Sequence, residues 1–306
     1  MTSIPAVQSA PWWINPAARF IQRLPAGRYR VMNWIGERHA DPFWARMPAE
    51  LGALFFRCHL GDRIMREVCL MGRYEPQETA LLQQILRSGM VFVDVGANWG
   101  YFTLAAAHLV GRAGRVLSIE VDPRACRALK DNVARNGLDH VSVLEMAASD
   151  APGMLKMQEY ESAANDSGNF GLARSTTVVE HGHRFDVAAR PLDDVLDEAG
   201  IDRVDLLKMD IEGGEGRALT GLRGALASRR VARLLLELHP HHLRDQGSST
   251  ERVIAELRGY GYGAWKIDHS SAVYRRVAAG QMDVMSALTP LKDGDDLGPW
   301  PHLFWI

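Results

Sequence analysis

The sequence contains few cysteines, no excess charge of either sign and no long apolar run. Its three cysteines, Cys58, Cys69 and Cys126, form no CxxC pair, so neither a disulfide framework nor a cysteine-built zinc site is expected. Thirty-five basic against 37 acidic residues give a net charge of −2, which supplies no global reason to expect a nucleic-acid partner. No stretch approaches the ~20 apolar residues of a membrane span, and the N-terminus does not resemble a signal peptide. We therefore expect a cytoplasmic protein that binds neither membrane nor nucleic acid.

The first quarter of the 306-residue chain differs in composition from the rest. Residues 1–73 hold ten arginines, no lysine and five acids, together with four of the eight tryptophans. Within them, LFFRCHLGDRIMREVCLMG is interpreted as two strands turning at Gly61-Asp62. We predict that residues 1–73 form an N-terminal cap or extension with a short β-hairpin, which covers a crevice of the main domain, residues 74–306, or makes a subunit contact in a homo-oligomer.

From Tyr74 onward, helical and extended patterns alternate. Helices are predicted near residues 76–88, 101–110, 123–137, 192–200 and 251–261, several of them opened by proline or closed by glycine. Short apolar runs between them predict strands near residues 91–95, 115–120, 141–146, 204–210, 231–238 and 262–267. Such alternation predicts an α/β fold with a Rossmann-like, doubly wound and mostly parallel sheet.

The stretch VFVDVGANWGYF, residues 91–102, carries the first sign of chemistry. A buried strand is predicted to end near Asp94 and to pass Gly96 and Gly100 before a helix begins. Glycines at such a turn let the backbone approach a ligand closely. Glu120 ends the next predicted strand, where a carboxylate can bind the two hydroxyls of a ribose.

The same residues favour S-adenosylmethionine over NAD as the cofactor. An NAD site needs a second glycine where this sequence has Asn98, and Asp94 would repel the pyrophosphate. S-adenosylmethionine has a ribose, an adenine and two cationic groups but no phosphate, so it suits a carboxylate at this position. S-adenosyl-L-methionine is therefore the predicted cofactor, and the NAD dehydrogenase hypothesis is the weakest.

Eight segments in order resemble the FkbM family of S-adenosylmethionine-dependent methyltransferases. They are YEPQE, FVDVGANWGYF, GRVLSIEVDP, NVARNG, AASD, PLDD, LLKMDIEGGE and LLLELHP. The resemblance covers roughly residues 74 to 240 and implies a class I methyltransferase fold. One departure is IEVDP, where many members have EP directly.

The resemblance also implies roles for single residues. Glu120 would bind the ribose, Val121 would pack on the adenine, and Met146 and Ala147 would meet the adenine edge. The remaining positions predicted to hold the cofactor are Glu75, Glu78, Asp94, Gly96, Asn98, Gly100 and Asp210. For Glu78, helix N-terminal charge that complements the helix dipole is an equally good interpretation.

Two later strand ends supply candidate catalytic residues. Lys208 and Asp210 lie on one face of a predicted strand, and Glu237 and His239 end the next one in the same way. Charges there either pair among themselves or face the reaction. A methyl acceptor must lose a proton, so we predict His239 as the general base, with Asp210 as the runner-up.

Substrate-binding and metal-binding residues are less clearly indicated. Residues 159–183 form a long polar stretch that predicts a lid or binding loop, with Asn165, Asn169 and Arg174 as acceptor contacts and Glu212 beside them. Histidines at positions 181, 183, 239, 241 and 242 are interpreted as solvated or catalytic side chains, so no metal is expected.

Three functional hypotheses remain open. The leading one is O-methylation of a hydroxyl on a small polar acceptor, such as a sugar of a glycan or a specialised metabolite. The second keeps the cofactor but changes the reaction, to intramolecular cyclisation or hydrolysis. The third is a non-catalytic module that binds the cofactor or a partner.

Overall fold

The structure is a computed structural model that describes residues 8–24, 27–39, 41–158, 174–175 and 184–306. Within these ranges an eight-stranded sheet has the order β14-β13-β15-β12-β11-β4-β5-β6. Five neighbouring strands of it are mutually parallel: β12 (Leu234–Glu237), β11 (Leu206–Met209), β4 (Val91–Val95), β5 (Arg115–Glu120) and β6 (Val141–Glu145). This arrangement confirms the predicted α/β fold with a mostly parallel sheet.

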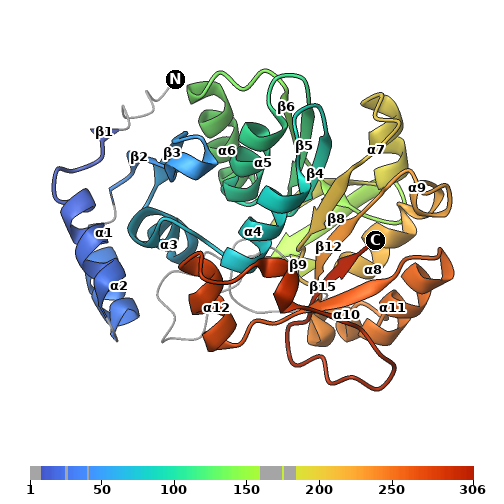
Figure 1. The fold of residues 1–306 in the computed structure, drawn as a ribbon. Coiled ribbons are helices and arrows are strands. Elements are labelled where there is room, and N and C mark those ends of the chain that lie inside the picture. Colours follow the sequence, from blue (N-terminus) through green and yellow to red (C-terminus); the bar gives the residue numbers. More distant parts are fainter. Residues whose placement is uncertain (1–7, 25–26, 40, 159–173, 176–183) are drawn as a thin grey trace, which may run out of the picture.

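Helices cover both faces of the sheet (Figure 1). One face carries α4 (Pro76–Ile85), α5 (Tyr101–Val110) and α12 (Ser271–Ala278), and the other carries α7 (Leu192–Glu198), α8 (Glu215–Thr220), α9 (Arg223–Ala227) and α11 (Thr250–Gly259). Along β4, Phe92 belongs to the first apolar core, whereas Val93 and Val95 belong to the second. Alternation along the strand therefore explains why its sequence is apolar throughout.

The C-terminal strands depart from the parallel pairing of the other five. Strand β15 (His302–Trp305) lies between β12 and β13 (Ala264–Ile267) and is antiparallel to both, while β14 (Leu288–Pro290) pairs with β13 at the edge. Sequence patterning missed β15 because HLFW is a short run after a segment rich in glycine, aspartate and proline. Its insertion brings His302 beside Glu237.

A hairpin does occur in the N-terminal segment, but not where the sequence predicted it. The paired strands are β2 (Phe43–Arg46) and β3 (Phe55–Cys58), with β1 (Gln8–Ser9) beside β2 and the turn η1 (Ala49–Leu51) between β2 and β3. The predicted second strand is wrong, because Arg63–Met71 form the helix α3. Asp62 caps this helix by accepting a 2.8 Å hydrogen bond from the Met65 N–H, a start signal that competes with the strand pattern.

The N-terminal segment packs on the main sheet's helices. Its helices α1 (Ile14–Arg23) and α2 (Arg28–Gly36) lie at one end of the molecule (Figure 1). Arg57 pairs with Asp131 of α6 (Pro123–Arg135) at 2.8 Å, and the Phe55 N–H donates to Asn136 at 2.8 Å. Its buried side chains join the same apolar core as those of α4 and α5. We find no separate core for this segment among the described residues.

A second, smaller sheet stands beside the carboxyl edge of the first. Its order is β7-β10-β8-β9, with β7 (Ala147–Ala148), β8 (Gly153–Gln158), β9 (Arg174–Ser175) and β10 (Arg184–Arg190). The remaining elements are α10 (Pro240–Asp245) and η2 (Val284–Ala287). No helix in the described ranges is long and apolar enough to cross a membrane.

Candidate active site

A pocket opens at the carboxyl ends of β4, β5, β6 and β11. It encloses about 840 Å³ of empty space, including the part open to solvent. Its lining joins the glycine turn after β4, the ends of β5 and β6, strand β8, and the turn after β11. Open α/β sheets bind ligands at this edge.

Gly96 shapes the floor of the pocket. Its φ is +84°, and a Cβ built on it would lie 1.9 Å from the backbone oxygen of Asp210. The turn after β4 therefore lies directly against the turn after β11, and only glycine permits this approach. The predicted role of Gly96 as a backbone position at the cofactor site agrees with this geometry.

Glu120 presents a buried carboxylate to the pocket. Its two oxygens accept hydrogen bonds from the Asn98 N–H at 2.6 Å and the Asp122 N–H at 2.8 Å. Burial raises the pKa of Glu120 to about 7 despite these bonds. The side chain is thereby held at the end of β5, where a ligand hydroxyl can donate to a remaining lone pair.

One wall beside Glu120 is apolar. Val121, Met146 and Ala147, all predicted from the sequence, line it, and strand β8 adds Leu155 and Met157. A carboxylate next to an apolar wall matches a ribose joined to an adenine. The described lining therefore fits the predicted cofactor, S-adenosylmethionine, at its nucleoside end.

Other predicted cofactor residues support the turn instead of lining the pocket. Asp94 is buried under it and accepts a 2.7 Å hydrogen bond from the Thr103 hydroxyl, while its Oδ1 has no hydrogen-bond partner in the described part of the chain. Burial raises the pKa of Asp94. Asn98 contributes its backbone N–H, and Gly100 is the N-cap residue immediately before α5. None of the three lines the pocket in the structure.

Beyond Asp210 the pocket gives way to a cluster of charges. Lys208 is buried; its Nζ lies 3.5 Å from Asp210 Oδ2 and 4.7 Å from the centre of the Phe102 ring. Burial alone would lower the pKa of Lys208, but the carboxylates of Asp210 and Glu75 raise it above its ordinary value. Lys208 is therefore a fixed cation beneath Asp210.

His239 is enclosed by carboxylates. Its Nδ1 lies 3.0 Å from Glu215, and its Nε2 lies 3.5 Å from Glu212, 3.7 Å from Glu237 and 3.9 Å from Asp210. Although burial favours the neutral ring, the hydrogen bond to Glu215 and the nearby carboxylates raise the pKa of His239 to about 9. The ring is thus protonated at neutral pH, which conflicts with its predicted role as the base.

The four predicted catalytic residues do lie together. Glu237 joins them from β12, and burial with the charges of Asp210 and Glu75 raises the pKa of Glu237 well above its ordinary value. Of the four, only Asp210 lines the pocket. Two sets of side chains here have ligand atoms within 4.8 Å of one another and could hold a metal ion: Asp210, Glu212 and His239, and Glu75, Asp210 and Glu237.

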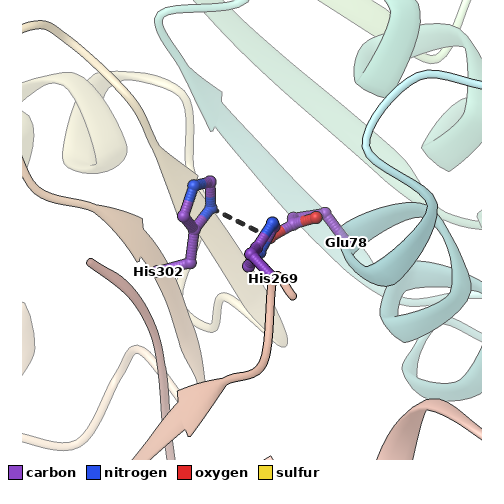
Figure 2. Close-up of side chains that lie close together, drawn as sticks. All are labelled: Glu78, His269 and His302. Atoms are coloured by element: carbon purple, nitrogen blue, oxygen red, sulfur yellow. Dashed lines mark hydrogen bonds and ion pairs between the residues drawn. The ribbon is translucent and has the colours of Figure 1, made fainter. Parts of the chain in front are cut away.

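Glu78 does not line the pocket. Its carboxylate lies 2.7 Å from His269 Nε2 and 2.9 Å from His302 Nδ1 (Figure 2). Although burial opposes it, these two rings lower the pKa of Glu78. The charge of Glu75, three residues earlier with φ +43°, contributes to the raised pKa of Lys208, and burial raises the pKa of Glu75 itself.

The predicted acceptor contacts are only partly described. Asn165 and Asn169 lie outside the described residues, and only the backbone of Arg174 is described, in β9. Glu212 lines the pocket at the turn after β11.

Sequence reasoning missed Glu215, His269 and His302. Glu215 had a local signal in KMDIEGGE, whereas the two histidines come from C-terminal segments without any recognisable motif. Only the inserted strand β15 places His302 here.

Comparison with known proteins finds methyltransferases of the FkbM family. The family described as the methyltransferase FkbM domain matches residues 94–263. The chain is 31% identical over 200 residues to the 31-O-demethyl-FK506 methyltransferase FkbM of Streptomyces tacrolimicus, a match that covers 58% of this chain and 74% of that protein. It is 28% identical over 149 residues to the 2-O-methyltransferase NoeI of Sinorhizobium fredii, covering 46% of this chain and 60% of that protein.

A solved structure, the methyltransferase FkbM from Methylobacillus flagellatus KT, matches with a TM-score of 0.43 and 16% identity. That match covers 95% of this chain and 58% of the other. At this TM-score the structural likeness adds nothing to the sequence matches.

Proposed function

Because the chain belongs to the FkbM methyltransferase family, whose members depend on S-adenosylmethionine, we propose that it methylates a hydroxyl of a small polar acceptor. Family membership confirms the cofactor and the methyltransferase activity that the sequence predicted. The O-methyl chemistry, the acceptor class and the roles of single residues belong to the proposal.

The pocket supplies the binding surface for the cofactor. When bound, S-adenosylmethionine supplies an electrophilic methyl group on a sulfonium. Glu120 would accept hydrogen bonds from the ribose hydroxyls, and Val121, Met146 and Met157 would enclose the adenine. The turn at Gly96 would pass beneath the methionine end, next to Asp210.

Asp210 is the proposed general base. Of the four predicted catalytic residues it is the one that lines the pocket, and 22% of its side chain is exposed. An acceptor hydroxyl beside it would lose its proton to Asp210 as its oxygen bonds to the methyl carbon and the carbon–sulfur bond breaks. The products are the methyl ether, S-adenosylhomocysteine and a protonated Asp210. His239 is a poorer base because it is 3% exposed and its pKa of about 9 keeps it protonated.

The surrounding charges hold Asp210 in place. Lys208 lies on one side at 3.5 Å and His239 on the other at 3.9 Å, so two cations fix the orientation of its carboxylate. Since catalysis of methyl transfer depends largely on alignment, this fixed geometry is itself a catalytic contribution.

A hydroxylated acceptor suits this side of the site. Carboxylates accept hydrogen bonds, so Asp210 and Glu212, which line the pocket, can bind the hydroxyls of a sugar or polyol. The names of the two relatives above denote O-methylation, which supports the same class. Cytoplasmic location and assembly into a homo-oligomer remain predictions.

Product analysis tests the proposal. Purified protein incubated with S-adenosylmethionine and a panel of sugars, polyols and hydroxylated metabolites should form S-adenosylhomocysteine in equal amount to a methyl ether. Methylthioadenosine or homoserine lactone as the product would instead indicate the alternative cofactor-consuming reactions. Cofactor binding without turnover on any acceptor, or methylation at nitrogen or carbon, would contradict the proposed chemistry.

A further inference from the structure

Three side chains beside the charge cluster have the composition of a transition-metal site. They are Glu78 of α4, His269 after β13, and His302 of β15. Figure 2 shows the two imidazole rings and the carboxylate facing one another. Their ligand atoms lie within 4.8 Å of one another, although the three residues lie up to 224 positions apart, from Glu78 to His302.

The distances fit adjacent ligands of one ion. Glu78 Oε1 is 2.7 Å from His269 Nε2 and 2.9 Å from His302 Nδ1. Metal–ligand bonds of about 2.0–2.2 Å place neighbouring ligand atoms about 3.0–3.5 Å apart, so each histidine nitrogen needs to move away from Glu78 Oε1 by only about half an ångström. The two rings are stacked, with centroids 3.8 Å apart and an interplanar angle of 26°, and one nitrogen of each ring approaches the same carboxylate oxygen.

Hydrogen bonding among these side chains leaves one atom unsatisfied. Both rings approach Oε1 of Glu78, while Oε2 is buried and has no hydrogen-bond partner in the described part of the chain. Glu78 is 1% exposed, so water cannot readily compensate. A bound cation would neutralise the whole carboxylate and give Oε2 a partner.

A carboxylate also lies near the second ring nitrogen of one of the histidines. Glu237 Oε1 lies 3.6 Å from His302 Nε2, the nitrogen that faces away from Glu78. Metal-binding histidines commonly direct their second N–H at such a carboxylate, which fixes the tautomer and strengthens the ligand. The register of β12 and β15 places Glu237 directly opposite His302.

From this geometry we propose that Glu78, His269 and His302 bind a divalent first-row transition metal ion. Two imidazoles and one carboxylate are a common ligand set for Zn²⁺ and Fe²⁺, with further positions open to water or a ligand. His269, 30% exposed in its side chain, leaves a path to solvent. The site ties α4 to the C-terminal strands and adjoins the acceptor side through Glu237. It does not depend on the proposed acceptor.

Metal binding itself tests the proposal. Tag-free protein treated with a chelator and then titrated with Zn²⁺ alone should take up one equivalent in calorimetry. Co²⁺ in its place should give a visible absorption band typical of nitrogen and oxygen ligands. Zn²⁺ should also raise the melting temperature.

Matched variants distinguish this site from its surroundings. His269→Gln and Glu78→Gln should abolish the equivalent of bound metal, and Glu237→Gln should weaken binding by about 10–100-fold. His241→Gln, which replaces an exposed histidine paired with Arg244, should bind as the wild type does. His269 follows β13 in a partly exposed position, so its variant is expected to fold, which circular dichroism would check.

The outcomes are exclusive. Absence of stoichiometric binding, or binding that persists in His269→Gln and Glu78→Gln, would overturn the proposal. Loss of binding in His239→Gln alone would move the site to Asp210, Glu212 and His239. Because no methyl acceptor is needed, failure of the proposed methylation would leave the metal result unaffected.

Discussion

The two halves of the site are built by different means. The cofactor half takes its glycine turn, its carboxylate and most of its apolar wall from residues 94–147; β8 adds two side chains, and residues within 210–217 and 242–246 also line the pocket. It contains a backbone turn, an apolar wall and one carboxylate. The acceptor half gathers Glu75, Lys208, Asp210, Glu237 and His239 from distant segments and is held by charge.

The two halves therefore depend on different physical properties: the cofactor half on the shape of the backbone, and the acceptor half on the arrangement of charges. The cofactor half depends on where the backbone can pass, so it should tolerate no added atom at Gly96. The acceptor half depends on the balance of carboxylates and cations, so isosteric changes that only remove charge should have large effects there.

Gly96→Ala is expected to have the largest effect on the cofactor half. The new Cβ would lie 1.9 Å from the Asp210 backbone oxygen, so the turns after β4 and β11 must separate. We expect cofactor binding to fall below detection in calorimetry and the free energy of unfolding to drop.

Gly137→Ala is the matched control. Gly137 also has a positive φ, +60°, but no atom lies within 4 Å of a Cβ built there. It should lose only about 1–2 kcal/mol of stability and keep its cofactor affinity. Equal cofactor binding in both variants would contradict the role given to the backbone contact.

In the acceptor half, Asp210→Asn should lower the rate of methyl transfer by ~10²–10⁴-fold at saturating acceptor, because the amide cannot take the proton. Steady-state kinetics would measure it. Asp202→Asn, an exposed acid before β11, should behave as the wild type. If Asp210→Asn keeps its turnover while His239→Gln loses it, the base is His239, as the sequence first suggested.

Several residues predicted for the cofactor half do line the pocket, because the signals for them are local. Gly96 and Met146 each follow a strand, and Glu120 ends one, whose apolar run is recognisable on its own. Met157 escaped prediction because β8 belongs to a separate small sheet whose position the pattern does not give.

For the acceptor half, the sequence predicted which residues lie there but not their protonation states. The ends of β11 and β12 are recognisable, but pKa values depend on neighbours that the chain supplies from elsewhere. Glu215 turns His239 into a cation, and His302 arrives on a strand inserted from the C-terminus. Pairings between distant segments of this kind leave no periodic trace in the sequence.

His239 makes stability depend on pH. Its pKa rises from an ordinary 6.5 to about 9 in the folded protein, so folding favours the protonated ring. That contribution is complete below pH 6.5 and is lost as the pH rises through 9. The free energy of unfolding should therefore fall by about 3 kcal/mol over this range because of His239.

Urea denaturation at several pH values would measure this dependence. The groups facing His239 are Asp210, Glu212, Glu215 and Glu237, with the His242 ring stacked on it. His239→Gln should flatten the profile between pH 6.5 and 9, whereas His241→Gln should leave its slope unchanged. A wild-type profile without this fall would mean that the ring is neutral in the fold.

Glu120→Ala should have the smallest effect, since it removes one polar contact from a pocket shaped mainly by backbone and apolar side chains. We expect S-adenosylmethionine affinity to weaken by about 1–3 kcal/mol in calorimetry. Because burial raises the pKa of Glu120 to about 7, wild-type affinity should increase as the pH rises through 7, when the carboxylate becomes a full acceptor, and the variant should lack that increase. Glu145→Ala is the control, as Glu145 lies opposite Glu120 in the β5–β6 ladder but does not line the pocket. If the wild type, Glu120→Ala and Glu145→Ala bind S-adenosylmethionine with equal affinity, the ribose does not contact Glu120, and the carboxylate is not part of the cofactor half.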